Sequence, residues 1–183
     1  FYIMLKASLI TFLTLFICSI SLAQQYSQSG VIHTDMQLYT KNGIQINGTS
    51  KEMHIEYPVQ DQKMEVTIDP HTIKTDNIEF DQQLYDCLLE DFVFVAELDA
   101  SSLEYHSNYN ETIELQTRAT INNVTQNVML YLIISNKKTT NRNVMEISGK
   151  GRISISDFKL DEIFPNLEGE LIVRFTQNLI ITY

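Results

Sequence analysis

Cysteine is scarce in this chain of 183 residues, and its two copies are Cys18 and Cys87. Cys18 lies in a segment that we expect to be removed, so the mature chain would keep Cys87 alone. That excludes an intrachain disulfide, and the fold must therefore rely on its hydrophobic core. Cys87 is then a small buried apolar residue, a nucleophile or a cysteine that pairs between chains. We favour the first because no histidine lies near it in the sequence.

Basic residues are also few. The chain has 13 Lys and Arg against 23 Asp and Glu, which gives a formal net charge of −10. No basic cluster offsets this balance, and such a surface repels phosphates and anionic lipid head groups. We therefore expect no nucleic acid among the partners.

Long apolar runs are limited to one, from Ala7 to Ile20, which is shorter than the ~20 residues that a membrane-spanning helix needs. It follows Lys6 and precedes Ser21-Leu22-Ala23, a small-x-small sequence that signal peptidase accepts. We predict a secretory signal peptide over residues 1–23, cleaved after Ala23, and a periplasmic or secreted location. Because repeats and Pro- or Gly-rich linkers are lacking, residues 24–183 are predicted to form a single domain.

Alternation of apolar and polar residues dominates the remaining sequence. Ile32, Thr34, Met36 and Leu38 share one face, and the Asn-Gly pair of Lys41-Asn42-Gly43 favours a tight hairpin after them. Residues 81–91 break the alternation and predict one short helix that starts at Asp81 and carries Leu84, Cys87 and Leu88 on one face. About eight or nine strands without α-β-α alternation predict an all-β antiparallel barrel or sandwich.

The stretch TINNVTQNVMLYLII, residues 120–134, is apolar on both faces of its predicted strand. Val128, Leu130, Leu132 and Ile134 would point one way, and Met129, Tyr131 and Ile133 the other. Strands of antiparallel sheets commonly expose one face to water. Two interpretations are open: one face lines a ligand-holding lumen, or both faces are core, with one packed under the helix.

Glycine and glutamine interrupt two later strand patterns. Gly149 and Gly151 separate the apolar runs 144–148 and 152–156, so Gly-Lys-Gly is predicted as a hairpin; it lacks the spacing and following helix of a phosphate loop. The last strand is apolar on one face from Leu171 to Ile181, and only Gln177 interrupts that face.

No catalytic set of nucleophile, base and orienting group is recognisable, so we expect neither an enzyme nor a cofactor. His33-x-Asp35 and His54-x-Glu56 each place an imidazole and a carboxylate on one strand face, a pairing that can bind a metal. Those faces are the polar ones, which favours solvated strand residues, and we expect no metal site.

Five segments, in order along nearly the whole mature chain, resemble the YceI-like family of secreted lipid-binding proteins. They are INGTS (46–50), EVTIDPHTIKTDN (65–77), DQQLYDCLLEDFVFVAEL (81–98), TINNVTQNVML (120–130) and GKGRISISDFKLDE (149–162). Asn123 stands where the family usually has glycine, and asparagine still tolerates the left-handed turn conformation.

This resemblance implies a lipocalin-like antiparallel barrel of about eight strands with one short helix, whose lumen holds a long isoprenoid or similar apolar lipid. The protein would be a non-enzymatic carrier or buffer. The candidate lumen residues are Phe92, Phe94, Ile113, Leu115, Val128, Leu130, Leu132, Leu171, Val173, Phe175, Leu179 and Ile181.

Polar residues at the mouth would hold the lipid head group, and the candidates by residue type are Tyr57, Tyr85, Tyr105, Tyr109 and Arg118. The alternative function is a structural or stress-related interaction module with a self-filled core and no bound lipid. A homodimer is left open.

Overall fold

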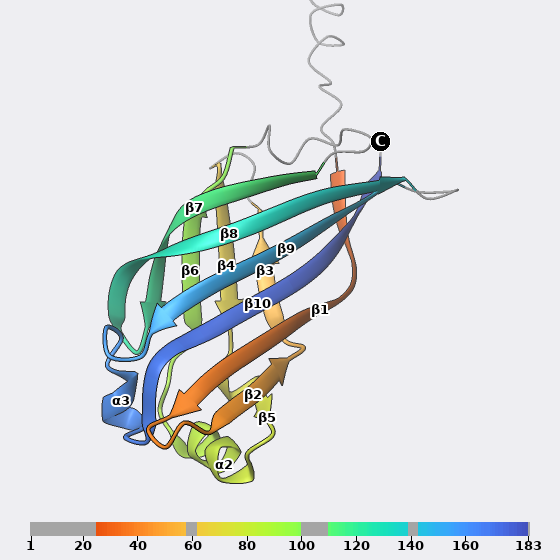
Figure 1. The fold of residues 1–183 in the computed structure, drawn as a ribbon. Helices are drawn as coiled ribbons and strands as arrows, with labels where there is room; N and C mark the ends of the chain where they lie inside the picture. Colours follow the sequence, from red (N-terminus) through yellow and green to blue (C-terminus); the bar gives the residue numbers. More distant parts are fainter. Residues whose placement is uncertain (1–24, 58–61, 100–109, 139–142, 183) are drawn as a thin grey trace, which may run out of the picture.

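The computed structural model describes residues 25–57, 62–99, 110–138 and 143–182. Within this part, one ten-stranded sheet curls on itself into a half-barrel (Figure 1). Its strands are β1 Gln25–Thr40, β2 Gln45–Ser50, β3 Met53–Glu56, β4 Lys63–Ile68, β5 Lys74–Thr75, β6 Phe92–Glu97, β7 Asn110–Ile121, β8 Val124–Lys138, β9 Asn143–Ser154 and β10 Leu167–Thr182. The helices are α2 Ile78–Asp86, α3 Leu160–Ile163 and the 3₁₀-helix η2 Pro70–Thr72.

The strand order is β3-β4-β6-β7-β8-β9-β10-β1-β2-β5, and every paired neighbour is antiparallel. The predicted antiparallel barrel class is therefore confirmed. In the described part, β3 and β5 are the edges of the sheet, so backbone hydrogen bonds do not close it. Side chains meet instead where β3 lies beside β1, since Thr34 Oγ1 donates to Met53 Sδ at 3.3 Å.

The turns follow the predicted chemistry. β1 and β2 form a hairpin around Gly43, whose φ is +75°. β7 and β8 are joined through Asn122 and Asn123, whose φ values are +51° and +59°. Asparagine tolerates this left-handed conformation better than most residues, so Asn123 suits the positive φ that this turn requires.

The helix starts at a different residue from the predicted one. α2 starts after Asn77, whose Oδ1 accepts from the Phe80 backbone N–H at 2.9 Å. Asp81 is not the cap; its carboxylate accepts from the backbone N–H and hydroxyl of Thr75. The extended backbone of Cys87 ends the helix, so Leu88 is fully exposed, contrary to the prediction.

Cys87 is half-buried, and its Sγ donates to the Leu84 carbonyl at 3.1 Å. It packs against the edge of the core. This placement fits the small apolar role better than that of an exposed nucleophile.

The Gly-Lys-Gly sequence is not a hairpin, which corrects the prediction. β9 runs without interruption from Asn143 to Ser154, and Gly149 and Gly151 are inward-facing positions in its middle. Gly149 is aligned with Phe175 on β10, and a Cβ added to Gly149 would overlap the Phe175 ring. The glycine therefore stays in the strand because a neighbouring aromatic ring occupies the space of its missing side chain.

The two faces of β8 have different surroundings. Leu130, Leu132 and Ile134 are buried in the interior, whereas Met129, Tyr131 and Ile133 are 43%, 44% and 46% exposed on the outside. α2 lies at one end of the curled sheet, near β2 and β5 (Figure 1), and does not cover them. Of the two interpretations left open, the one in which the helix packs on this outer stripe is therefore wrong (Figure 1).

Among the described residues, no helix has the length and apolar character needed to cross a membrane.

The contact between Phe175 and Gly149 predicts an asymmetry between the two glycines of β9. Gly149→Ala should lower the free energy of unfolding by about 2 kcal/mol, because its Cβ displaces the ring in a filled core. Gly151→Ala is the matched control: its Cβ would lie 3.5 Å from Leu130 Cδ1, an ordinary contact, so no loss is expected. Urea unfolding of both variants measures the difference. Equal stabilities would contradict the described packing.

Candidate functional site

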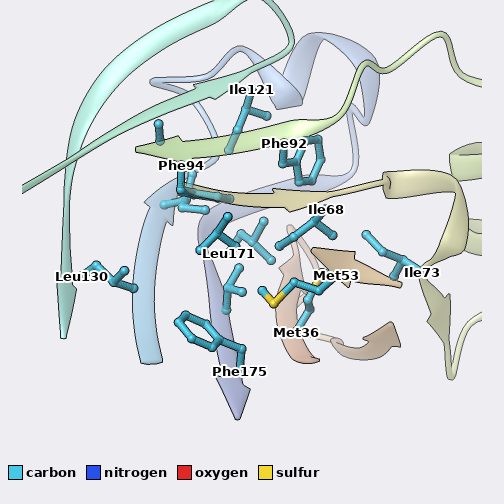
Figure 2. Packing of buried hydrophobic residues seen from close by; sticks show 14 of the residues in the cluster. Met36, Met53, Ile68, Ile73, Phe92, Phe94, Ile121, Leu130, Leu171 and Phe175 are labelled. Atoms are coloured by element: carbon cyan, nitrogen blue, oxygen red, sulfur yellow. The ribbon is translucent and has the colours of Figure 1, made fainter. Parts of the chain in front are cut away.

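The interior of the half-barrel contains a first cavity at mid-height. Its volume is about 20 Å³. Its lining is Met53, Val66, Ile68, Phe94, Val128, Leu130, Gly151, Ile153, Val173 and Phe175. Figure 2 shows Leu130 and Phe175 pointing into this interior from β8 and β10, with Met53 across from them. Among the described residues, this wall contains no charged side chain, and its one hydrogen-bonding side chain is Met53, whose Sδ accepts from Thr34 Oγ1.

A second cavity of about 30 Å³ lies toward the helix-bearing end. Its lining is Met36, Leu38, Gly48, Ile73, Thr75, Phe80, Leu84, Phe92, Leu160, Phe164, Leu167 and Leu171. α2 and the segment after α3 close this end, since the rings of Phe80 and Phe164 lie 5.1 Å apart between centroids.

The two cavities follow each other along the same strands. On β10, Val173 and Phe175 line the first cavity, and Leu167 and Leu171 line the second. On β6, Phe94 lines the first and Phe92 the second. From Phe175 to Leu167 the strand covers roughly 26 Å, at about 3.3 Å per residue. The lining is thus long and narrow, and its surface is almost wholly apolar.

The structure brings most of the predicted lumen residues to these walls. Five of them line the first cavity (Phe94, Val128, Leu130, Val173 and Phe175), and Phe92 and Leu171 line the second. Leu115, Leu132 and Leu179 are buried in the same interior, and Ile113 is partly buried against it. Ile181 lies in β10, but its side chain is outside the part that the structure describes.

Sequence reasoning missed the lining that comes from the opposite wall. Met36, Met53, Val66 and Ile68 belong to alternating runs that are visible in the sequence, but nothing in one strand indicates which distant strand it faces. Gly151 was missed because the Gly-Lys-Gly pattern predicts a turn.

One polar pair interrupts the apolar interior. Gln177 is 2% exposed, and the Tyr57 hydroxyl donates to its Oε1 at 3.3 Å. Within the described residues, Gln177 Nε2 has no hydrogen-bond partner. Burial raises the pKa of Tyr57 well above its ordinary value of 10, because the phenolate would lose its hydration.

The other predicted head-group residues lie elsewhere. Tyr85 is 70% exposed on α2, and Arg118 is exposed on the outer face of β7. Tyr105 and Tyr109 lie outside the described residues. Of the five candidates, Tyr57 is the one that the described structure places at the interior.

The charged residues of the described part stand on the outside. His33 and Asp35 form an exposed pair at 3.1 Å, and His54 and Glu56 form another at 2.8 Å. Neither pair gathers a third ligand: among the described residues, no group of three His, Cys, Asp or Glu side chains could hold a metal ion.

A wider hollow of about 620 Å³ lies where the β6–β7 ladder stops. Charged side chains of both signs, including Glu97, Glu114 and Arg118, line it, so it does not suit an alkyl chain.

The geometry agrees with one protein family. The model of the YceI-like domain matches residues 23–177. The chain belongs to the YceI-like family. No curated protein matches it.

Solved structures with the same fold include other proteins with YceI-like architecture. A polyisoprenoid binding domain from Saccharophagus degradans, implicated in plant cell wall breakdown, has a TM-score of 0.70 at 10% identity, covering 87% of this chain and 99% of its own. BcnA of Burkholderia cenocepacia has a TM-score of 0.52 at 12% identity, with 82% and 96% covered. A mutant CJ YCEI protein with a monobromobimane guest has a TM-score of 0.50 at 21% identity, with 72% and 83% covered. At these identities the likeness concerns the fold of this YceI-like chain.

Burial of Tyr57 predicts a loss of stability in alkali. Its pKa is raised on folding, so its contribution is fully present below pH 10 and is lost as the pH rises above 10. Above that pH, the wild type should lose up to about 1.4 kcal/mol more per pH unit than Tyr57→Phe. Free energies of unfolding measured from pH 9 to 11 give the two slopes.

Tyr85→Phe, which changes an exposed tyrosine on α2, is the control and should follow the wild-type curve. Parallel curves for wild type and Tyr57→Phe would contradict the burial of the Tyr57 hydroxyl.

Proposed function

We propose that this YceI-like chain is an exported, non-enzymatic protein that binds an isoprenoid-like or other long apolar lipid inside its half-barrel, as a carrier or buffer. Two apolar cavities that follow each other along the lumen carry this proposal. The polyisoprenoid binding of the Saccharophagus degradans domain gives it independent support. The signal-like residues 1–23 support export to the periplasm or beyond.

Burial of hydrocarbon would provide the affinity. Each CH₂ removed from water contributes about 0.8 kcal/mol, so one five-carbon isoprenoid unit contributes about 4 kcal/mol. Three units would contribute about 12 kcal/mol, which is comparable to the 4–15 kcal/mol that association costs. A ligand of several units is therefore favoured over a short one, because only the longer chain exceeds the cost.

The lining must move for such a chain to enter, since each cavity has room for only about one or two water molecules. Met53 lines the first cavity and Met36 the second, both on the wall that β1 and β3 form (Figure 2). Methionine is unbranched and adapts its rotamers at low cost. Rotation of these two side chains would enlarge both cavities without a change in the sheet.

Native mass spectrometry of the chain exported from a bacterial host, followed by solvent extraction, tests the proposal. One apolar lipid per chain is expected. Gly151→Val should abolish it, because the added methyl groups enter the first cavity beside Leu130. Arg152→Val, the same side chain on the outer face of the same strand, should keep the lipid. Protein that is empty as purified and stays empty after incubation with isoprenoid lipids would contradict lipid carriage.

A second candidate function, a protein-interaction module, is favoured by the exposed ridge of Met129, Tyr131 and Ile133 on β8. We propose a second copy of the chain as the partner. Tyr131 is aligned with Glu114 on β7 and with Lys150 on β9. A two-fold axis along β8 would stack the two ridges and place Glu114 of one copy opposite Lys150 of the other, so the pattern is self-complementary.

Sedimentation of wild type and Tyr131→Glu tests this homodimer. The wild type should sediment as a dimer, and the variant as a monomer because its new carboxylate would be buried without a partner. Tyr39→Glu, at an exposed tyrosine on β1, should remain dimeric. Exchange of the Glu114 and Lys150 charges together should restore a dimer that Glu114→Lys alone weakens. A wild type that is monomeric at every concentration would exclude the homodimer.

A further inference from the structure

The three most exposed large apolar side chains of the described part belong to α2 and the residues just after it. Leu88 is 100% exposed, Ile78 85% and Tyr85 70%, whereas the next, Ile44, is 59% exposed. Apolar residues that are exposed singly need no explanation. Here three of them fall within eleven consecutive residues, at the outer end of the half-barrel where α2 lies (Figure 1).

Ile78 and Tyr85 lie on the same side of α2. They are seven positions apart, which is close to two turns, so their side chains leave the helix in one direction about 10 Å apart. Phe80 and Leu84 are buried and leave the helix on the opposite side. Leu88 follows three residues after Tyr85, beyond the end of the helix. The helix thus carries two apolar faces, and the core uses the inner one.

Carboxylates accompany the outer face. Residues 74–91 contain the acidic residues Asp76, Glu79, Asp81, Asp86, Glu90 and Asp91 and the basic residue Lys74. Six acids and one lysine give this segment a formal charge of −5, half of the −10 of the whole chain. Glu79 and Asp86 are both exposed and are again seven positions apart, so they form an acidic row beside the apolar row of Ile78 and Tyr85.

This charge decides which occupant suits the apolar face. An anionic lipid surface would be repelled by it. A second copy of the chain, bound through the same face, would bring a second charge of −5 against the first. A protein segment with lysine or arginine next to apolar residues complements both rows. Because the rows repeat about every two helical turns, a partner helix with the same repeat can contact them along its length.

We infer that the outer face of α2 is a docking surface for a partner protein that presents a cationic amphipathic helix. Its apolar residues would pack on Ile78, Tyr85 and Leu88, and its lysine or arginine side chains would pair with Glu79 and Asp86. The docking surface is independent of the proposed lipid binding, because these five side chains are exposed and line neither apolar cavity.

Fluorescence titration of the exported chain with a helical peptide tests this surface. The probe is a peptide of about 18 residues, five turns, with leucine and one tryptophan on one face and lysine on the other. The chain has no tryptophan, so the emission of the peptide reports binding without background from the protein. The lysine peptide should bind, and less tightly as salt is added. The same peptide with glutamate for every lysine should not bind.

Two pairs of variants locate the binding. Ile78→Ser with Leu88→Ser should lower the affinity about tenfold, because the apolar contact is lost. The matched control, Met129→Ser with Ile133→Ser, removes two exposed apolar side chains from β8 and should bind like the wild type.

The second pair tests the charges. Glu79→Gln with Asp86→Asn should lower the affinity about threefold. Glu65→Gln with Glu97→Gln removes the same charge from exposed positions on β4 and β6 and should have no such effect. All of these side chains are exposed, so the urea midpoints of the variants should match that of the wild type.

Four results would overturn the docking surface. The first is equal affinity in wild type, Ile78→Ser with Leu88→Ser and Glu79→Gln with Asp86→Asn, since the peptide would then bind elsewhere. The second is binding of the glutamate peptide as tightly as the lysine peptide. The third is binding of neither peptide. The fourth is binding of phosphatidylcholine vesicles in place of the peptides, lost in Ile78→Ser with Leu88→Ser, which would make the face a membrane contact.

Discussion

Burial of the inward face of a single curled sheet is the constraint on which the rest of this protein depends. The described part of the chain holds one cysteine and its sheet has two free edges, so neither a disulfide nor a closed ladder joins the ends of the sheet there. Side chains join them instead, since Thr34 meets Met53 between β1 and β3, and Tyr57 meets Gln177 between the end of β3 and β10. Nearly every inward position is apolar because each of them contributes to closure as well as to local packing. The polar exceptions are correspondingly few.

Much of this architecture can be predicted from the sequence. The rest depends on contacts between segments that are distant along the chain. Alternation grouped the residues of each face of β8 and β10, because the period of a strand is local, but it did not decide which face of β8 points inward. The turns at Gly43 and Asn123 were also predictable, since positive φ restricts the residue type. Gly149 and Gly151 were wrongly predicted as a turn because the Phe175 ring that replaces the missing side chain lies on another strand, 26 positions away along the chain from Gly149. The lining from β1, β3 and β4 was missed for the same reason: the curl of the sheet, not any one strand, decides which walls face each other.

The start of α2 shows how two possible capping residues, only four positions apart, compete for the helix N-terminus. Asp81 and Asn77 are both good caps by residue type, and the chain uses Asn77 because Asp81 accepts two hydrogen bonds from Thr75 instead. The start of α2 then shifts, Phe80 becomes a core residue and Leu88 becomes exposed. This choice of cap also affects the candidate site, because Phe80 and Phe164 together line the second cavity.

β3 and β1 meet through side chains rather than through a ladder, and this contact affects the circumference of the half-barrel. The neighbouring strands of the sheet are joined by antiparallel ladders, whose hydrogen bonds hold the strands about 4.8 Å apart. Between β3 and β1, the Thr34 hydroxyl donates to the Met53 thioether, and a methionine sulfur is a weak acceptor. In the part of the chain that the structure describes, no ladder pairs β3 with β1, so the circumference can widen there without the loss of a strand-to-strand ladder. In the described part of the chain, side-chain contacts rather than a backbone ladder therefore determine the width of the interior between β3 and β1.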